Sequence, residues 1–464
     1  MHPIEHVVVL MLENRSFDVL LGRLYPKSAQ FDGLAGDESN SWHKPDGTVE
    51  TIPVWNSDEV TAEAARLPDP EPGELFSDVT MQLFGLTADL SAPPTMDGFV
   101  DNYVRQPPPY HPDDPRGVMH GFLPAQVPAI STLAKAFGVS DRWHASAPCE
   151  TWPNRYFAHC GTAGGYVNND RSRFPSQWPR TMPTIFRRLD RHGYGWKIYF
   201  HDLPQTATLL DLWPKIPTRF CLFEAEFERH ARSGRLPAYS FIEPRYFPSL
   251  LGNKPPNDQH PPHNLLFGEQ LIATVYNAVR NAPTWPRTLL IITYDEHGGC
   301  YDHAPPPAAV PPGGPYPDGF HFDRYGVRVP AVIVSPYIAP GSVVRPPPQP
   351  DGAPAAPFDH ASIPATLHKL FNIGAPLTPR VAAAPDLLSA LTLDSPDNQG
   401  PERLSIDPRP PDPGEVRAYW QRHRNRHQRN LWHPTISLPA AAAGIVGLTR
   451  AAGARLMPEG WRRR

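Results

Sequence analysis

The strongest chemical signal in the sequence is the segment TLLIITYDEHGGCYDH, residues 288–303. An apolar run typical of a buried strand ends in Asp295 and Glu296, and a Gly-Gly pair and His303 follow. Adjacent carboxylates repel each other and are costly to bury unless a cation is present. Oxygen ligands suit a hard or borderline divalent ion, and the glycines would let the backbone approach closely. The segment therefore indicates either a metal site or a solvated acidic turn.

A second acid follows another strand-like run. The segment HVVVLMLENRSFD is apolar until Glu13 and Asn14, and it then continues as a helical pattern. Parallel strands bring their carboxyl ends to one edge of a sheet, where the ligands of α/β proteins bind. We therefore expect Glu13 and Asn14 at the same edge as Asp295 and Glu296.

A threonine lies at a predicted helix start in SAPCETWPNRYFAHCGTAGG. Pro153 is typical of a first helical turn, which places Thr151 at the N-cap or one position from it. A threonine there most simply caps the helix, for about 1 kcal/mol. Beside a metal and at the positive end of the helix dipole, the same hydroxyl could instead be a nucleophile. Asn154 and Arg155 in the first turn could donate to phosphate oxygens.

Two other segments carry histidines. PNDQHPPH places Asp258, His260 and His263 in a proline-rich loop before a helix. These histidines could bind a metal or transfer protons, although most histidines in loops simply face solvent. In FDHASIPATL, Asp359 is predicted to be a helix N-cap with His360 as its neighbour.

The elements that would position these residues alternate along the chain. Continuous apolar runs indicate strands buried on both faces, at residues 6–12, 138–143, 194–200, 238–243, 288–295 and 329–337. Helical periodicity lies between them, at residues 126–137, 181–193, 220–234, 268–282 and 363–372. This alternation predicts an α/β fold with a doubly wound, mostly parallel sheet and helices on both faces.

The domain organisation follows from composition. The chain has 464 residues, which is enough for one large α/β domain with insertions or for two domains. Its 62 prolines gather in loops and indicate stiff connections. Residues 1–395 are predicted to form the catalytic domain, within which the polar stretch 23–125 is a proline-rich insertion forming a rim or lid. Residues 396–464 are predicted to be a basic C-terminal extension. Its arginine-rich end would either contact an anionic lipid surface or pack on the domain.

Charge and cysteine content exclude several classes of protein. A net charge of -4 favours neither nucleic acid nor an anionic surface as the partner of the whole molecule. The four cysteines form no CxxC pair; Cys149 and Cys160 either pair or, more simply, are free thiols. No run of 18 apolar residues predicts a membrane span, and no signal peptide is expected. We therefore expect a cytoplasmic protein, or one exported by an unrecognised route.

Together these motifs resemble the bacterial phospholipase C and acid phosphatase family, a branch of the alkaline-phosphatase-like superfamily. In chain order they are IEHVVVLMLENRSFDVLLG, TWPNR with HCGTAGG downstream, PNDQHPPH, DEHGGCYDH and FDHASIPATL. The resemblance runs from residue 4 to about residue 392 and is weaker across 23–95. It implies the alkaline-phosphatase-like fold and a metal-dependent phosphoesterase.

The resemblance also implies a role for each matching residue. Thr151 would be the nucleophile and carry a phospho-threonine intermediate. Asn154 would help to hold the phosphoryl oxygens, and His260 or His303 would protonate the leaving group. The divalent ion could be Ca, Zn, Mg or Mn. Its ligands would be Glu13, Asn14, Thr151, Asp295 and Glu296.

The threonine at 151 and the long proline-rich rim resemble the phospholipase C side of the family. The predicted reaction is hydrolysis of a phospholipid phosphodiester to diacylglycerol and a phosphorylated head group. Nearby aromatic residues would either contact a choline group or belong to the core; they are Trp143, Trp152, Tyr156, Tyr166, Trp178 and Tyr301. The alternatives are a broad-specificity acid phosphatase acting on phosphomonoesters and a metal-bound scaffold that binds sugar or lipid without catalysis.

Overall fold

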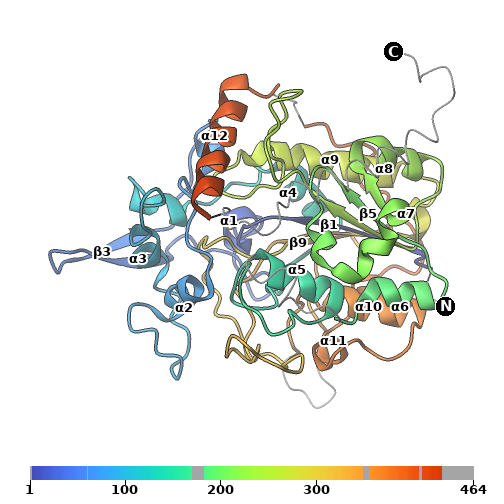
Figure 1. Cartoon of the computed structure of the whole chain (residues 1–464), viewed down its shortest axis with the longest axis horizontal. Coiled ribbons are helices and arrows are strands. Elements are labelled where there is room, and N and C mark those ends of the chain that lie inside the picture. The colour runs from blue at the N-terminus through green and yellow to red at the C-terminus, as the bar shows by residue number, and fades with distance from the viewer. Residues whose placement is uncertain (1–2, 60, 170–181, 349–354, 407–409, 431–464) are drawn as a thin grey trace.

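One eight-stranded sheet forms the centre of the molecule (Figure 1). The structure is a computed structural model, and it describes residues 3–59, 61–169, 182–348, 355–406 and 410–430. The strand order is β10-β4-β9-β8-β1-β7-β5-β6. The strands are β1 (His6–Leu12), β4 (Gly138–Ser140), β5 (Trp196–Phe200), β6 (Phe220–Leu222), β7 (Tyr239–Glu243), β8 (Thr288–Tyr294), β9 (Ala331–Val334) and β10 (Ser342–Val343). The sequence placed six of these strands.

The sheet is mostly parallel, and the exception is β9. This strand pairs antiparallel with both β8 and β4, whereas the other pairs in the sheet are parallel. A parallel pair needs a crossover, usually a helix, that returns the chain to the amino end of the sheet. Residues 295–330, between β8 and β9, contain no helix. The chain therefore enters β9 from the carboxyl end.

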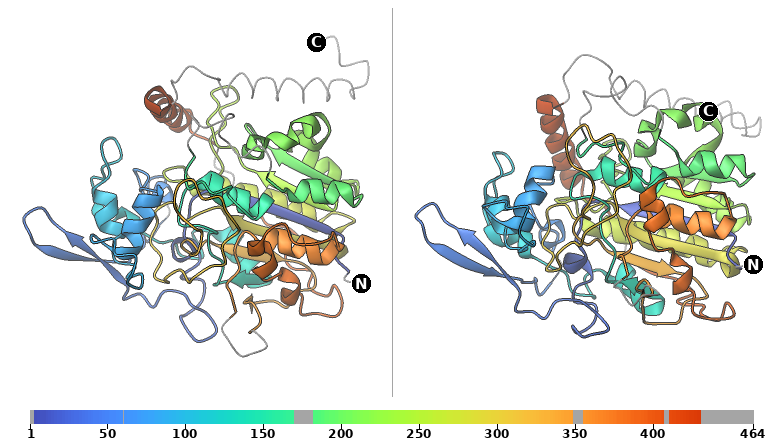
Figure 2. Two further views of the ribbon diagram at one scale, coloured as in Figure 1. Left: turned by 60° about the horizontal axis from the view of Figure 1, so that its bottom comes forward. Right: turned by 90° about the horizontal axis from the view of Figure 1, so that it is seen from below.

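Helices cover both faces of the sheet, as expected for a doubly wound fold (Figures 1 and 2). One face carries α4 (Pro128–Ala136), α8 (Phe223–Arg232) and α9 (Leu265–Arg280). The other carries α5 (Thr151–Cys160), α6 (Ile185–Arg191), α10 (Ser362–Phe371) and α11 (Pro379–Ala383). The prediction of the α/β class is confirmed.

Short elements complete the described chain. The predicted helix 220–234 begins as β6, where the apolar Phe220 pairs with Ile198 of β5 at the edge of the sheet, and becomes helical only at α8. Short helices elsewhere are α1 (Phe17–Leu20), α7 (Ile216–Arg219), η1 (Ala64–Arg66), η2 (Pro115–Met119), η4 (Gln205–Thr208), η5 (Leu210–Lys215), η6 (Trp285–Arg287) and η7 (Leu387–Ala390).

The stretch 23–125 has a small core of its own. It contains the hairpin of β2 (Ser39–His43) and β3 (Val49–Pro53), together with α2 (Phe76–Phe84) and α3 (Phe99–Val104). Side chains from α2 and α3 pack there with Tyr301 and Val327 of the main domain. In Figure 1 these blue and cyan elements lie beyond the carboxyl ends of the central strands. A rim around a site at that edge would occupy this position.

The C-terminal part of the described chain packs on the domain. Leu404 belongs to the main core, and its backbone and that of Pro401 accept hydrogen bonds from side chains of α9. α12 (Pro413–Asn430) docks through Tyr419, whose hydroxyl accepts from the Asn264 amide at 3.0 Å. None of the helices in the described part of the chain has the length and apolar character needed to span a bilayer. The basic tail 431–464 lies outside the described residues.

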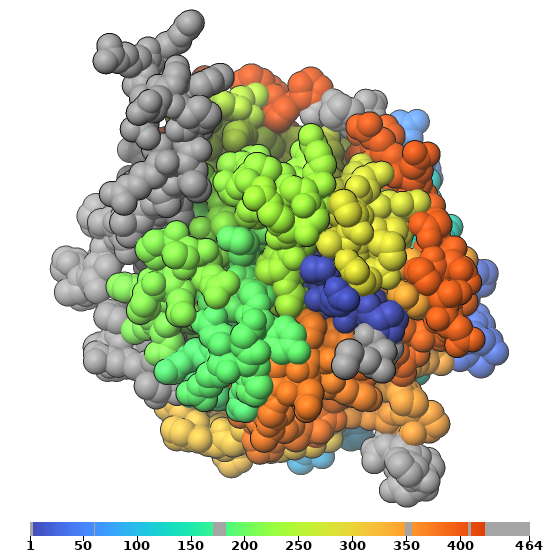
Figure 3. Space-filling view, turned by 90° about the vertical axis from the view of Figure 1, so that its right-hand side faces the viewer, coloured from blue at the N-terminus to red at the C-terminus, as the bar shows by residue number. Residues whose placement is uncertain are grey.

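The predicted site residues lie at only one end of the sheet. Figure 3 looks onto the amino end, where the first described residues of the chain (blue) emerge among green, yellow and orange segments from later in the chain. The chemically interesting residues follow the opposite ends of the strands.

Candidate active site

The central strands β1 and β8 bring the predicted ligands together. Leu12 lies opposite Tyr294 in the parallel register, and the Asp295 amide donates to the Leu12 carbonyl at 3.3 Å. The next residues of each strand are therefore neighbours. The backbone amide of Asn14 donates to Asp295 Oδ1 at 3.4 Å. The four side chains of this group, which we call the acidic centre, are buried; they are Glu13, Asn14, Asp295 and Glu296.

Backbone geometry packs the loop after β8 against Asn14. Gly298 and Gly299 both have positive φ, 63° and 66°. A Cβ on Gly298 would lie 2.5 Å from the Asn14 carbonyl oxygen, so only glycine permits this approach. Asn14 itself has φ 55°, a conformation that asparagine tolerates better than most residues. The close approach predicted for the Gly-Gly pair is therefore present.

The electrostatics of the acidic centre require a positive partner. Burial, and then the charge of Asp295, raise the pKa of Glu13 well above its usual range. Burial also raises the pKa of Asp295 and of Glu296. Among the described residues, the guanidinium of Arg155 contacts the group directly: its Nε donates to Asp295 Oδ2 at 2.9 Å, and its Nη2 lies 3.5 Å from Glu13 Oε1. The His260 ring adds a weaker positive influence on Glu13. One guanidinium leaves three carboxylates incompletely compensated.

The acidic centre fits a divalent cation. Asn14 Oδ1 and Glu296 Oε1 are buried and have no hydrogen-bond partner among the described residues. Buried oxygens of this kind are normally paired, and an oxygen-rich set of carboxylates and an amide suits a hard cation. No hydrogen-bond donor among the described residues pairs with Asn14 Oδ1 or Glu296 Oε1.

Helix α5 connects Thr151 to this centre. Its N-cap is Glu150, so Thr151 is one position from the cap, as predicted. Arg155 lies four residues later on the same face of the helix and holds Asp295 and Glu13. No hydrogen bond joins the Thr151 hydroxyl to the acidic centre in the described chain. The nucleophilic role of Thr151 therefore stays a prediction.

The side-chain amide of Asn154 forms hydrogen bonds with the backbone of the preceding loop. Its Oδ1 accepts from the Ala147 amide at 3.0 Å, and its Nδ2 donates to the carbonyl oxygens of Cys149 at 2.8 Å and Glu150 at 3.1 Å. Asn154 thus orders the backbone that leads into Thr151, and a contact with phosphate would require it to leave these partners. Cys149 and Cys160, on either side of this segment, are free thiols.

The proline-rich loop supplies His260 to the same edge. The Glu13 amide donates to the Asp258 carbonyl at 2.9 Å, which fastens the loop to the end of β1. His263 Nδ1 lies 2.7 Å from Asp258 Oδ1. Burial lowers the pKa of His260, but its hydrogen bond with Glu74 and the surrounding carboxylates outweigh burial and raise the pKa to about 10. The His260 ring is therefore positively charged at neutral pH.

His303 lies in a separate charged group around Arg328. Its Nδ1 is 2.6 Å from Asp18 and its Nε2 is 3.3 Å from Asp32. Asp18, Asp302 and His303 have possible metal-ligand atoms within 4.8 Å of one another. However, Arg328 donates to both Asp18 and Asp302 at 2.9 Å, so a guanidinium already neutralises these carboxylates. Both nitrogens of His303 face carboxylates of this group.

The prediction for Asp359 is wrong. The N-cap of α10 is Ala361, and Asp359 is instead buried with Ser146 Oγ at 2.9 Å and Arg380 Nη1 at 3.1 Å. A buried arginine partner outweighs the local capping preference. His360 then reaches the centre, with its Nε2 2.5 Å from the Asp295 carbonyl oxygen. Burial lowers the pKa of His360 to about 4, so its ring is neutral.

Glu74 of the insertion contacts Asn14 and lies near His260, although no motif in the sequence marks it as a site residue. Most of the aromatic residues that were candidates for head-group contacts belong to the core. Trp143, Trp152, Tyr156 and Tyr301 are buried. Trp178 lies outside the described residues.

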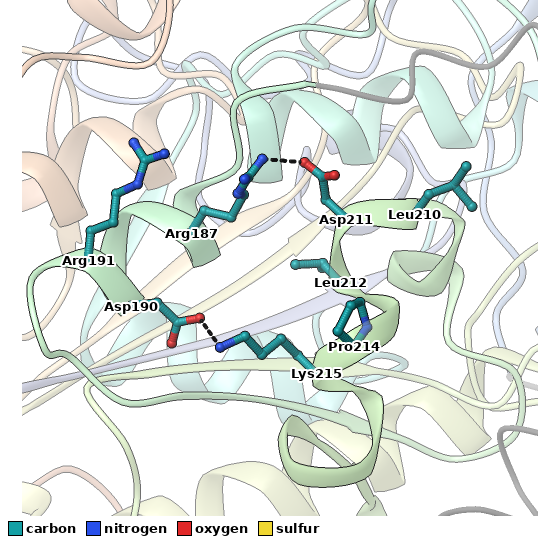
Figure 4. Close-up of a pocket in the computed structure, with 8 residues that line it drawn as sticks. All are labelled: Arg187, Asp190, Arg191, Leu210, Asp211, Leu212, Pro214 and Lys215. Atoms are coloured by element: carbon teal, nitrogen blue, oxygen red, sulfur yellow. Dashed lines mark hydrogen bonds and ion pairs between the residues drawn. The ribbon is translucent and has the colours of Figure 1, made fainter.

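A surface hollow of about 460 Å³ lies elsewhere (Figure 4). It lies between α6 and η5 and is crossed by the ion pairs of Arg187 with Asp211 and of Asp190 with Lys215. Asp190 also accepts from the indole of Trp196, the first residue of β5. The hollow is therefore near the amino end of the sheet, away from the acidic centre.

Comparison with known proteins decides the family. The model of the Phosphoesterase family matches residues 4–374. The chain belongs to this family. It is 39% identical over 410 residues to non-specific phospholipase C1 of Arabidopsis thaliana, covering 87% of this chain and 74% of that protein. It is 40% identical over 404 residues to non-specific phospholipase C6 of the same plant, covering 84% and 73%.

More distant bacterial proteins match as well. Non-hemolytic phospholipase C of Pseudomonas aeruginosa is 26% identical over 444 residues, covering 85% of this chain and 58% of that protein. Among solved structures, the lipoteichoic acid synthase LtaP of Listeria monocytogenes matches with a TM-score of 0.35 and 12% identity, covering 67% of this chain and 88% of that one. The family membership and the phospholipase C relatives identify a phosphoric ester hydrolase.

Proposed function

We propose that this phosphoesterase is a metal-dependent phospholipase of the C type. Its reaction would be hydrolysis of a phospholipid phosphodiester to diacylglycerol and a phosphorylated head group. The observation that carries the proposal is the acidic centre, in which Asn14 Oδ1 and Glu296 Oε1 are buried without a hydrogen-bond partner among the described residues. It lies at the sheet edge where α/β enzymes bind ligands. The phospholipase C names of the relatives support the choice of substrate.

Glu13, Asn14, Asp295 and Glu296 would hold the divalent ion, with Thr151 as a further ligand. When bound, the ion would lower the pKa of a neighbouring hydroxyl and offset the charge of the phosphoryl group. Arg155 keeps Glu13 and Asp295 in place from the side of α5.

The proposed chemistry is two successive displacements at phosphorus. The Thr151 hydroxyl releases its proton to solvent as Thr151 Oγ1 forms a bond to phosphorus, and the bond from phosphorus to the diacylglycerol oxygen breaks. His260 donates its proton to that oxygen. In the second displacement, water gives a proton back to His260 as its oxygen bonds to phosphorus. The bond from phosphorus to Thr151 Oγ1 breaks, the phosphorylated head group leaves, and Thr151 Oγ1 takes up a proton from solvent.

We favour His260 over His303 as the acid because of their partners. His260 lies beside the acidic centre on the loop fastened to Glu13, and its ring is protonated. Both ring nitrogens of His303 face Asp18 and Asp32.

The test compares two chromogenic esters with and without a chelator. We expect the metal-loaded protein to hydrolyse p-nitrophenyl phosphorylcholine faster than p-nitrophenyl phosphate, and a chelator to abolish the activity. Faster turnover of the monoester would show an acid phosphatase. Turnover of neither ester would favour a binding protein, and turnover that persists in chelator would contradict the metal requirement.

A lipid substrate also requires contact with a lipid surface, and we propose that one turn provides it. Leu250 and Leu251 are 51% and 87% exposed, and they lie in the loop between β7 and Asp258. Asn253 in this turn donates to the Pro411 carbonyl at 2.7 Å, next to the start of α12. The exposed leucines therefore lie on a segment that leads into the proline-rich loop of Asp258 and His260, which we call the active-site loop.

Co-sedimentation with phosphatidylcholine vesicles tests this contact. We expect Leu251→Asp to reduce the bound fraction several-fold. Leu90→Asp is the matched control, because Leu90 is 54% exposed but lies in the insertion. Equal binding of both variants and the natural chain would contradict the proposal.

A further inference from the structure

Glu74 brings a carboxylate of the insertion into the active site. It lies two residues before α2, and its side chain is 14% exposed. Asn14 Nδ2 donates to Glu74 Oε2, and the same oxygen lies 3.8 Å from His260 Nε2. Glu74 also interacts with Glu296, whose pKa is raised by burial and then by the charge of Glu74. Glu74 thus contacts two residues of the acidic centre and lies near the proposed proton donor.

Neighbouring contacts fix the position of Glu74. The carbonyl of Gly73 accepts from Gln82 Nε2 at 2.7 Å, and Gln82 Oε1 lies 2.8 Å from His297 Nε2. A Cβ on Gly299 would lie 2.5 Å from the same Gly73 oxygen. The loop after β8 therefore packs directly on the backbone beside Glu74, and the carboxylate is not on a free loop.

The charge of this carboxylate bears on which phosphate ester the site accepts. A phosphodiester has one negative charge, whereas a phosphomonoester carries nearly two at about pH 7 and above, because its second pKa is about 6. Repulsion between like charges grows in proportion to the charge of the ligand and is stronger in a poorly solvated site. A fixed carboxylate beside His260 and Asn14 therefore disfavours the monoester more than the diester.

We propose that Glu74 is a specificity-determining residue, which selects phosphodiesters by repelling phosphomonoester dianions. This inference rests on the proposed function, since it assumes that the phosphoryl group binds beside the acidic centre. It differs from a role as a metal ligand, because a ligand would be needed for metal binding whatever the substrate.

The isosteric change Glu74→Gln removes the charge and keeps the shape. The substrates are p-nitrophenyl phosphate and bis(p-nitrophenyl) phosphate, a diester without a cationic head group, assayed with metal-saturated protein at about pH 8. We expect the ratio of kcat/KM for the monoester to kcat/KM for the diester to rise at least about tenfold. Glu50→Gln is the matched control, because Glu50 is an exposed carboxylate on β3 of the same insertion; we expect it to leave the ratio unchanged.

Calorimetry with inorganic phosphate and dimethyl phosphate provides a readout independent of turnover. We expect Glu74→Gln to bind inorganic phosphate at least about tenfold more tightly, with the affinity for dimethyl phosphate nearly unchanged. Equal changes for both anions, or loss of bound metal in Glu74→Gln, would overturn the inference. A natural chain that hydrolyses neither ester would instead refute the proposed function, and the calorimetric comparison would still test Glu74.

Discussion

Asn14 and Glu296 each keep one buried oxygen without a donor, and this is the residue-scale reason to place a cation at the acidic centre. Burying an unpaired acceptor costs roughly 1–3 kcal/mol, and more when it is charged. Natural proteins retain such atoms mainly where a ligand or ion completes them. The carboxylates beside them add charge that Arg155 alone does not balance.

The nucleophile can be tested by removing one hydroxyl. We expect Thr151→Ala to lower kcat on the diester by at least about a thousandfold, because no other group would form the covalent intermediate. Thr151→Ser keeps a hydroxyl and is expected to retain a measurable fraction of the activity. Turnover of Thr151→Ala at the level of the natural chain would remove Thr151 from the mechanism.

His303 gives a prediction about stability and pH. Although burial lowers its pKa, hydrogen bonds to Asp18 and Asp32 raise it to about 9. The folded-state pKa of His303 exceeds the unfolded value, so the charged ring contributes to the free energy of unfolding. This stabilising contribution is complete below about pH 6.5 and is lost as the pH rises towards 9. We expect His303→Gln to lower the free energy of unfolding by about 2 kcal/mol near pH 6 and by at least 1 kcal/mol less near pH 10. Urea titrations at the two pH values measure this difference, and an equal loss at both would contradict it.

At the scale of elements, α5 is joined to the ends of β1 and β8 by one buried arginine. Arg155 donates to Asp295 and approaches Glu13, and its Nη2 also lies 3.2 Å from the Leu12 carbonyl. The helix that begins with Thr151 is thereby set against the strands that carry the acidic centre. This link accounts for why the Thr151 loop and the carboxylates belong to one site.

Removing this link should cost stability. In the metal-free protein, we expect Arg155→Met to lower the free energy of unfolding by about 3–5 kcal/mol, because it leaves buried carboxylates unpaired. The matched control is Arg187→Met, whose partner Asp211 lies at the surface hollow; we expect a cost below about 1 kcal/mol there. Denaturant unfolding compares the variants, and equal costs would contradict the role of Arg155.

Hydrophobic patterns predicted most strands because a strand buried on both faces reads as a continuous apolar run, as β1 and β8 do. They did not predict that β9 runs antiparallel, since direction depends on the connection and not on the strand's own residues. Likewise, short local motifs placed Glu13 and Asp295 at strand ends. The contact of Glu74 with Asn14 spans 60 residues and has no local signal.

Asn154 and Asp359 show the same limit within motifs. The residue types at these positions fit phosphate binding and helix capping, respectively. Their actual partners, the backbone of residues 147–150 and Arg380, become visible only in the fold.

At the scale of the whole molecule, the insertion and α12 meet beside the active-site loop. Arg422 of α12 pairs with Asp69 of the insertion, and Tyr419 contacts the ring of His263. The site edge is thus bordered by parts of the chain that are more than 300 residues apart. Substrate access to the acidic centre depends on these borders as well as on the sheet.

Metal binding should stabilise the whole chain. A ligand that binds only the folded state at about 100 times its Kd adds about 2.7 kcal/mol. We therefore expect saturating divalent metal to raise the Tm by several degrees and a chelator to reverse the change. Thermal unfolding of the chelated and the metal-loaded protein measures the effect, and an identical Tm for the two would count against a folded-state metal site.

The most direct test of the account counts the bound divalent ions in two variants. Glu296→Gln alters the acidic centre, and His303→Gln alters the other acidic group, which Arg328 already neutralises. We predict that equilibrium dialysis with elemental analysis will find metal in the natural chain and in His303→Gln, and at least about tenfold weaker binding in Glu296→Gln. Metal retained by Glu296→Gln and lost by His303→Gln would contradict the account and move the metal site to the group around Arg328.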